Sequence, residues 1–209
     1  IMAARAVANA VRSTMGPKGM DKLLVDSIVE VTITNDGVTI LKEMDVQHPA
    51  AKMLIEAAKT QDKEVGDGTT TVAVLVGELL KKAEVLLDQK VHPTMIVQGY
   101  RMAAEKAIEI AKTMAVDVSE DDRELLKKRA DTAMTGKLSE AADSKMSEYA
   151  VELVLNALET YNGKKKFDMD RVNVEKKVGE STLDSRIIEG VVIDKEIVHQ
   201  NMPRKVENA

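Results

Sequence analysis

The stretch Gly66–Thr71 concentrates the residue types that hold a phosphate group. It lies directly before a helical pattern, and a helix N-terminus offers free backbone N–H groups and a positive dipole end. Its glycines let backbone approach a phosphate closely, its three threonine hydroxyls can donate to phosphate oxygens, and Asp67 suits the Mg²⁺ that a nucleotide carries. Ordinary helix capping by the Asp and Thr side chains is the alternative interpretation, and no Walker A Gly-Lys-Ser/Thr follows.

Three further short stretches have groups that suit phosphate chemistry. Thr14–Gly19 follows a helical pattern, and its backbone could lie against a phosphate, although a helix C-cap and turn explain it as well. Asn35–Gly37 predicts a hairpin turn, and Asp36 could instead orient or deprotonate a water that attacks a phosphoryl group. Lys137 follows a short break between two helical patterns, where it is either solvated or able to reach a terminal phosphate.

Apolar residues at helical spacing predict a mainly α protein with small β elements. The helix over about 70–89 is apolar on nearly all sides at its start, which is typical of a buried helix. Alternating residues on both sides of Asn35–Gly37 predict a β-hairpin over 29–41, and short strands are expected at 172–175 and 190–194. The other predicted helices cover 1–14, about 49–64, about 94–114, a segment from Asp122 through Ala130, and 139–161.

Composition excludes several classes of protein. Hydrophobic residues make up 44% and aromatic residues 2%, so a core must be built from aliphatic side chains and the 12 Met. The net charge of −5 argues against nucleic-acid binding, and no apolar run approaches the roughly 18 residues that span a bilayer. The absence of Cys excludes disulfides, and the three His share no zinc-ligand spacing. We therefore expect a cytoplasmic protein without nucleic-acid or membrane partners.

Taken in order, these stretches resemble those of the chaperonin family, and most closely the group II chaperonins. The resemblance is carried by Thr14–Asp21, Ile33–Leu41 and Gly66–Thr71, while His48–Lys52 and Gly190–Lys195 are similar to the archaeal thermosome and its eukaryotic cytosolic relatives. It implies a helical equatorial domain over residues 1–121. It also implies the first arm of an α/β intermediate domain over 122–190 and the start of an apical domain over 191–209.

The resemblance also implies a site for ATP and Mg²⁺. Asp67 resembles the Mg²⁺ ligand, Asp36 resembles a carboxylate that helps activate the hydrolytic water, and Lys137 resembles a lysine that senses the terminal phosphate and couples it to ring closure. The nucleotide-binding residues that it implies are Thr14, Met15, Gly16, Pro17, Asn35, Gly37, Gly68, Thr69, Thr70 and Thr71.

The implied function is that of an ATP-dependent folding machine, in which subunits of a double ring close around unfolded polypeptide clients. Family members are far longer, so we expect an incomplete N-terminal portion whose natural start precedes Ile1. The second catalytic carboxylate of the family would lie on the returning intermediate arm, outside these 209 residues. Two alternatives are a truncated piece that binds nucleotide poorly or only packs on full-length subunits, and an unrelated helical phosphotransferase that uses Gly66–Thr71.

Overall fold

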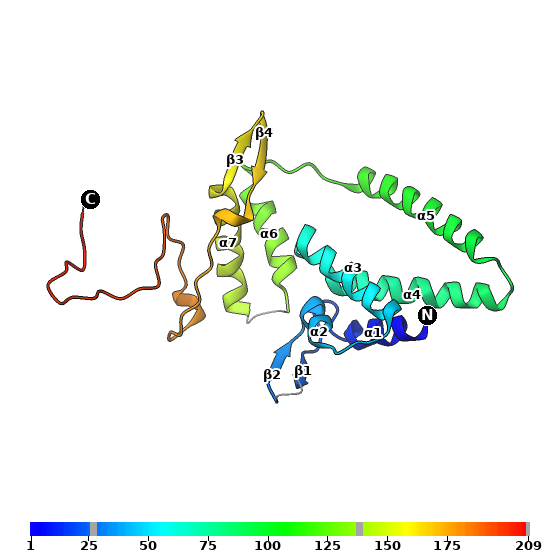
Figure 1. Cartoon of the computed structure of the whole chain (residues 1–209). Coiled ribbons are helices and arrows are strands. Elements are labelled where there is room, and N and C mark those ends of the chain that lie inside the picture. The colour runs from blue at the N-terminus through cyan, green and yellow to red at the C-terminus, as the bar shows by residue number, and fades with distance from the viewer. Residues whose placement is uncertain (26–28, 137–139, 208–209) are drawn as a thin grey trace.

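The computed structural model describes residues 1–25, 29–136 and 140–207, and within them the protein is mainly helical with two small antiparallel sheets, as predicted (Figure 1). The first group of elements comprises α1 (Met2–Arg12), β1 (Lys22–Val25), β2 (Val31–Thr34), α2 (Gly37–Glu43), α3 (Pro49–Val65), α4 (Thr69–Asp88) and α5 (Pro93–Met114). The second comprises α6 (Arg123–Met134), α7 (Glu140–Asn156), β3 (Leu158–Tyr161), β4 (Lys164–Phe167) and two short 3-10 helices, Met169–Arg171 and Thr182–Asp184.

The core lies among α1, α2, α3 and α4. Helix α1 buries Ala4, Val7, Ala8 and Val11, which recur on one helical face, and packs this face on α3 and α4. Alanines on α3 and α4 keep the helices close, because a methyl group needs little space between two backbones. None of the helices among the described residues is both long and apolar enough to cross a membrane.

The connection between α3 and α4 is a tight turn made by two glycines. Gly66 ends α3 in the left-handed conformation (φ 74°), and its N–H donates to the carbonyl of Asp62. Gly68, also left-handed (φ 79°), is the N-cap residue of α4. The chain therefore reverses within three residues, and α4 begins beside the end of α3.

The predicted hairpin over 29–41 is wrong in its second half. Strand β2 pairs backwards with β1, from Lys22 opposite Thr34 to Val25 opposite Val31, and residues 37–43 form helix α2. A short apolar run does not distinguish a strand from a buried helix. The Asp36 side chain caps α2 by accepting the N–H of Thr39 at 3.1 Å, and this favours the helix.

The predicted helix over 139–161 is also too long. Helix α7 ends at Asn156, and β3 pairs with β4 across a turn at Asn162 and Gly163, both with positive φ. That turn conformation suits a two-residue hairpin, which explains why the chain turns there. The strands predicted at 172–175 and 190–194 are wrong. Both segments lie within the described residues and are irregular there.

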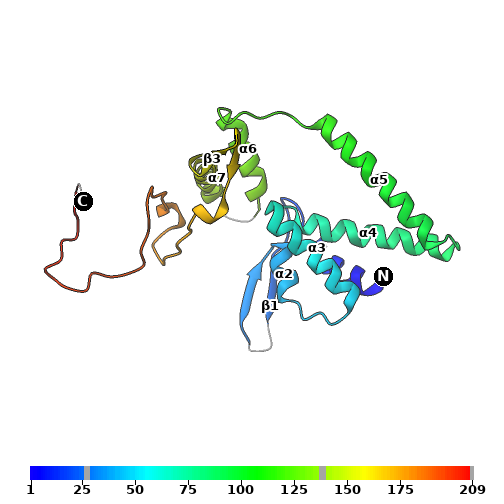
Figure 2. The same cartoon turned by 45° about the horizontal axis from the view of Figure 1, so that its top comes forward.

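Helix α5 leaves the bundle and leads to a separate group formed by α6, α7, β3 and β4 (Figures 1 and 2). Of the described residues of α5, Ile96 alone is buried. The hydroxyl of Tyr100 donates a hydrogen bond to the carbonyl oxygen of Leu79 in α4 at 2.7 Å. An irregular segment over 115–122 connects α5 to α6. After β4, the chain still contacts α7, where Lys145 and Tyr149 donate to the carbonyls of Leu183 and Ser185, and the residues that follow trail away from both groups (Figure 1).

Candidate functional site

Helices α1 and α4 pack side by side in opposite directions, and this places two of the predicted phosphate-binding stretches at the same end. Arg5, near the start of α1, forms an ion pair with Glu84 near the end of α4. Arg12, at the end of α1, forms an ion pair with Glu78, closer to the start of α4. The loop after α1, Thr14–Gly19, therefore emerges toward the N-terminus of α4, where Gly66–Thr71 lies.

The third predicted stretch, Asn35–Gly37, lies against the first turn of α4. A Cβ atom on Gly37 would overlap the Oγ1 atom of Thr70 and would be 3.0 Å from both its N and its Cα atom, which is tighter than most real Cβ contacts. Gly37 is buried, so a side chain there would have to displace the first turn of α4. The two stretches that resemble a phosphate site and a water-activating site are thus in direct contact.

The end of α6 joins the same site. The side-chain amide of Asn35 donates to the carbonyl oxygen of Gly136 at 2.5 Å. A Cβ atom on Gly136 would be 3.3 Å from the carbonyl oxygen of Pro17. Gly136 therefore contacts both the first and the third stretch, although it is 101 residues from Asn35 in the sequence. The next residue, Lys137, lies outside the described residues.

The N-terminus of α4 keeps the free N–H groups that an anion site requires. Gly68 occupies the N-cap position and offers no side chain, so no side chain caps the first turn of α4 among the described residues. The Asp67 carboxylate accepts the adjacent N–H of Gly68 at 2.8 Å, and Gln61 donates to the Asp67 carbonyl at 2.9 Å. The carboxylate is thus placed by the turn and does not cap the helix, contrary to the capping alternative.

The three threonines of α4 differ in exposure. Thr69 is buried, Thr70 is half-buried against Gly37, and Thr71 is exposed. No three His, Asp or Glu side chains among the described residues form a metal-binding cluster. A metal at Asp67 would therefore need ligands from the nucleotide and water, which is how Mg²⁺ usually binds.

The Asp36 side chain caps helix α2 through hydrogen bonds from Thr39. Its Oδ2 accepts both the N–H of Thr39 at 3.1 Å and the hydroxyl of Thr39 at 2.8 Å. The described residues offer no donor to its Oδ1, so this oxygen can accept a proton or orient a water. The cap holds the carboxylate at the start of α2, beside Gly37 and so beside α4.

The loop Thr14–Gly19 is held by hydrogen bonds to its own backbone and to the end of α1. The buried Thr14 donates its hydroxyl to the Val11 carbonyl at 2.8 Å, and the N–H of Met20 donates to the Ser13 carbonyl at 2.9 Å. Gly16 has φ 86°, and Met15 and Pro17 are exposed. The Thr14 hydroxyl is engaged by α1, and the N–H groups of Thr14, Met15 and Gly19 also donate to carbonyl oxygens. Of the loop's N–H groups, those of Gly16 and Lys18 have no such bond among the described residues, so they could face a phosphate.

Two contacts in this region were not predicted from the sequence. One is the meeting of Gly136 with Asn35 and Pro17. The other is the contact of Gly77 with Ala8 between α4 and α1, where a small residue on each helix is the signal that could have indicated it. Both depend on residues far apart in the chain.

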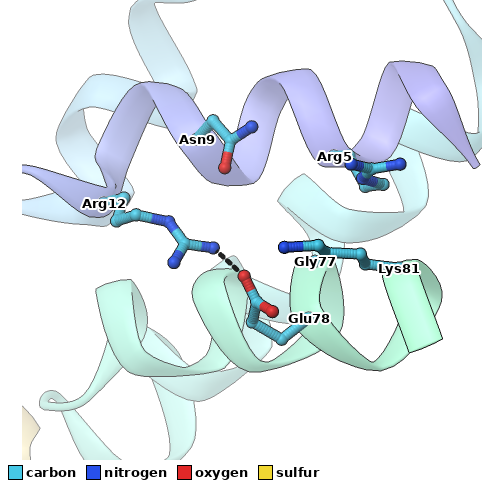
Figure 3. A pocket seen from close by; sticks show the side chains of 6 residues that line it. All are labelled: Arg5, Asn9, Arg12, Gly77, Glu78 and Lys81. Carbon is cyan, nitrogen blue, oxygen red and sulfur yellow. Dashed lines mark hydrogen bonds and ion pairs between the residues drawn. The ribbon is translucent and has the colours of Figure 1, made fainter.

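A cavity of about 120 Å³ lies along the contact between α1 and α4 (Figure 3). Arg12 donates to Glu78 across it and holds the pKa of that exposed carboxyl below its usual range, with weaker help from the nearby Lys81. The cavity is therefore crossed by one ion pair, and two further cationic residues line it. Its lining residues are Arg5, Asn9, Arg12, Gly77, Glu78 and Lys81.

Residues 7–209 match the sequence profile of the TCP-1/cpn60 chaperonin family. Over all 209 residues the sequence is 61% identical to the thermosome subunit alpha of Archaeoglobus fulgidus. It is 57% identical to thermosome subunits of Pyrococcus horikoshii and Methanopyrus kandleri, again over the full 209 residues. In each comparison the chain spans 38% of the length of the relative.

Proposed function

The chain belongs to the TCP-1/cpn60 chaperonin family as a group II member, and on that premise we propose that it binds and hydrolyses Mg-ATP as part of a protein-folding subunit. One observation carries the proposal. Four stretches that are far apart in the sequence, Thr14–Gly19, Asn35–Gly37, Gly66–Thr71 and Thr135–Gly136, meet around the N-terminus of α4. Family membership removes the alternative of an unrelated phosphotransferase.

The residues at the N-terminus of α4 fit the phosphate end of a nucleotide. The uncapped first-turn N–H groups and the hydroxyls of Thr70 and Thr71 would donate to phosphate oxygens. The Asp67 carboxylate, fixed by the turn, would hold Mg²⁺, whose charge would offset that of the phosphates. Within Thr14–Pro17, the N–H groups of Thr14 and Met15 donate to the carbonyls of Val11 and Arg12, and Pro17 has no N–H, so the Gly16 N–H is the backbone donor that this loop would contribute.

Asp36 is proposed as the carboxylate that orients the attacking water and takes its proton. The cap on α2 supports this role, because it fixes Oδ2 and leaves Oδ1 without a donor among the described residues, available to a water. Phosphoryl transfer needs little beyond positioning, metal and charge, so one fixed carboxylate is a substantial contribution.

Lys137 is proposed to detect the terminal phosphate. Its described neighbour Gly136 contacts both Asn35 and Pro17, and this supports the assignment. A lysine at that place would respond to the γ-phosphate and pass the response to α6 and α7.

The proposed division of the chain follows the two groups of elements. Residues 1–121 would be the equatorial ATP-binding domain, 122–190 the first intermediate arm and 191–209 the start of the apical domain. The irregular segment over 115–122 between α5 and α6 supports the first boundary. Within this proposal the partners are other subunits in a double ring and unfolded polypeptide clients, and the place is the cytoplasm.

The test uses the full-length gene product, meaning these residues with whatever sequence accompanies them in the organism. We expect steady-state phosphate release from Mg-ATP, lost when EDTA removes the Mg²⁺, and ATP-dependent recovery of a chemically denatured client enzyme. A purified, folded gene product without phosphate release would contradict the ATPase. Recovery of the client that is equal with and without ATP would contradict the coupling.

A further inference from the structure

We propose that Gly77 is a positioning residue for nucleotide hydrolysis, because its missing side chain sets the separation of the two loops that face the phosphates. The inference rests on the proposed function. Gly77 lies in α4 and touches no residue of the four converging stretches. It acts through Ala8 of α1, the helix that leads into Thr14–Gly19.

The contact between Gly77 and Ala8 has no room for a methyl group. A Cβ atom on Gly77 would be 2.5 Å from the Ala8 Cβ, a distance that real Cβ atoms do not reach. Both residues are buried, and neither has a flexible end that could move aside. A side chain at position 77 must therefore push α1 and α4 apart.

The two ion pairs beside this contact restrict how the helices can separate. Arg5–Glu84 and Arg12–Glu78 lie along the cavity edge, and Figure 3 shows Arg12 reaching across to Glu78. The arginines lie seven residues apart on α1, so α1 is tied to α4 at both ends. With both arginines paired, the cavity lies within the contact between α1 and α4.

A shift of α1 would be passed on to the phosphate-facing loop. Arg12 is the last residue of α1, and Thr14 follows after one residue, with its hydroxyl bonded to Val11. Gly77 is about 12 Å along α4 from Thr69, at roughly 1.5 Å per residue. Because a helix moves as a stiff element, separation at Gly77 widens the gap between Thr14–Pro17 and Asp67–Thr71. A misplacement of about 1 Å can lower a reaction rate roughly 100-fold.

The test is Gly77→Ala in the full-length gene product, assayed for Mg-ATP hydrolysis. We expect kcat to fall about 10- to 100-fold in molecules that circular dichroism shows to be folded. The matched control is Gly99→Ala in α5, where an added Cβ has no atom within 4 Å. It gives the same gain in helix propensity without the contact, and its kcat should equal that of the unchanged protein.

The rescue variant is Ala8→Gly combined with Gly77→Ala. It moves the methyl group from α1 to α4, and the new Cβ would be 4.0 Å from the Cα of residue 8, an ordinary contact. We expect most of the lost kcat to return. A crystal structure of Gly77→Ala should also show Thr14 farther from Thr70, a readout that needs no activity.

Three results would overturn the inference. They are wild-type kcat in folded Gly77→Ala, no recovery in the double variant, and an unchanged separation of Thr14 from Thr70 in the crystal. Failure of the proposed function is distinguishable, because the unchanged protein would then release no phosphate. In that case the crystal structure still decides whether Gly77 sets the spacing.

Discussion

Asp67 lies in the turn between α3 and α4, where its carboxylate bonds to the N–H of Gly68 at 2.8 Å. This bond orients the carboxylate without using it to cap α4. We predict that Asp67→Ala in the full-length gene product abolishes Mg-ATP hydrolysis, because the Mg²⁺ ligand is lost. Steady-state phosphate release is the measurement. Asp88→Ala, at the exposed far end of α4, is the matched control and should leave turnover unchanged. Near-normal turnover in Asp67→Ala would remove Asp67 from the metal role.

Asp36 has two roles that substitution can separate. Asp36→Asn keeps an oxygen acceptor for the N–H of Thr39 but cannot take a proton, so hydrolysis should fall about 100-fold or more while ATP affinity changes little. Asp36→Ala should also lose about 1 kcal/mol of stability from the missing cap. Phosphate release, calorimetric ATP binding and urea denaturation measure the three quantities.

Asp122→Ala is the control for the cap, because Asp122 caps α6 through the N–H of Leu125, away from the converging stretches. It should lower stability without lowering hydrolysis. If ATP affinity in Asp36→Asn collapsed in parallel with the rate, Asp36 would be a binding residue and not a water-positioning residue.

At the scale of elements, the ion pair between α1 and α4 gives a pH dependence. The hydrogen bond from Arg12 lowers the pKa of Glu78, so the pair stabilises the folded protein above the ordinary glutamate pKa of about 4.3. That contribution disappears as the pH falls through the lowered pKa. We therefore predict that the free energy of unfolding of Glu78→Gln, measured by urea denaturation, is slightly lower than that of the unchanged protein at pH 7. Near pH 3 the two free energies should be equal.

A thermodynamic cycle with Arg12→Gln provides the control. In that background the substitution of Glu78 should have little effect at either pH, because the hydrogen-bond donor is gone. A difference that persisted at pH 3, or in the Arg12→Gln background, would show that Glu78 acts through something other than this pair.

The sequence predicted most helices well because their apolar residues recur over long stretches. The helices expected over about 49–64, 70–89 and 94–114 are observed as α3, α4 and α5 to within about one residue at each end. The failures are short segments. Residues 38–41 are too few to show a period, and the cap from Asp36 decided for a helix. Likewise, residues 158–161 are too few to show a period of their own, and the turn at Asn162 and Gly163 pairs them with residues 164–167 as a hairpin, so α7 ends at Asn156.

The candidate site was predictable as a set of motifs but not as a geometry. Each stretch carries its own signal, such as the glycines and threonines of Gly66–Thr71. Their meeting depends on the antiparallel packing of α1 and α4 and on close approaches at Gly37 and Gly136. A single sequence does not indicate which residues distant in the chain come into contact. The contacts of Gly136 with Asn35 and Pro17 could therefore not be predicted from it.

At the scale of the whole molecule, the chain exposes far more surface than a compact protein. Its accessible surface is 16776 Å², whereas a folded monomer of 22.9 kDa has about 9,600 Å². Apolar residues contribute to this excess on α4 and α5. Examples are Leu75 at 56% exposed, Met102 at 64% and Ile108 at 57%.

We predict that these 209 residues on their own self-associate and hydrolyse ATP poorly, because exposed apolar faces favour association. Sedimentation velocity, paired with a phosphate-release assay on the same sample, measures both properties. The full-length gene product is the comparison. A compact 209-residue monomer with the turnover of the full-length protein would contradict the prediction, and would show that the catalytic set is complete within residues 14–137.

The central claim is that stretches far apart in the sequence close one site for Mg-ATP. Hydrogen–deuterium exchange of the full-length gene product, with and without Mg-ATP, tests it most directly. The account predicts that nucleotide slows exchange together in Thr14–Met20, Asn35–Thr39 and Gly66–Val72, with the same dependence on ATP concentration. Helix α5, which lies away from these stretches, should not change (Figure 1). Protection confined to one of these stretches, or located elsewhere in the chain, would contradict the account.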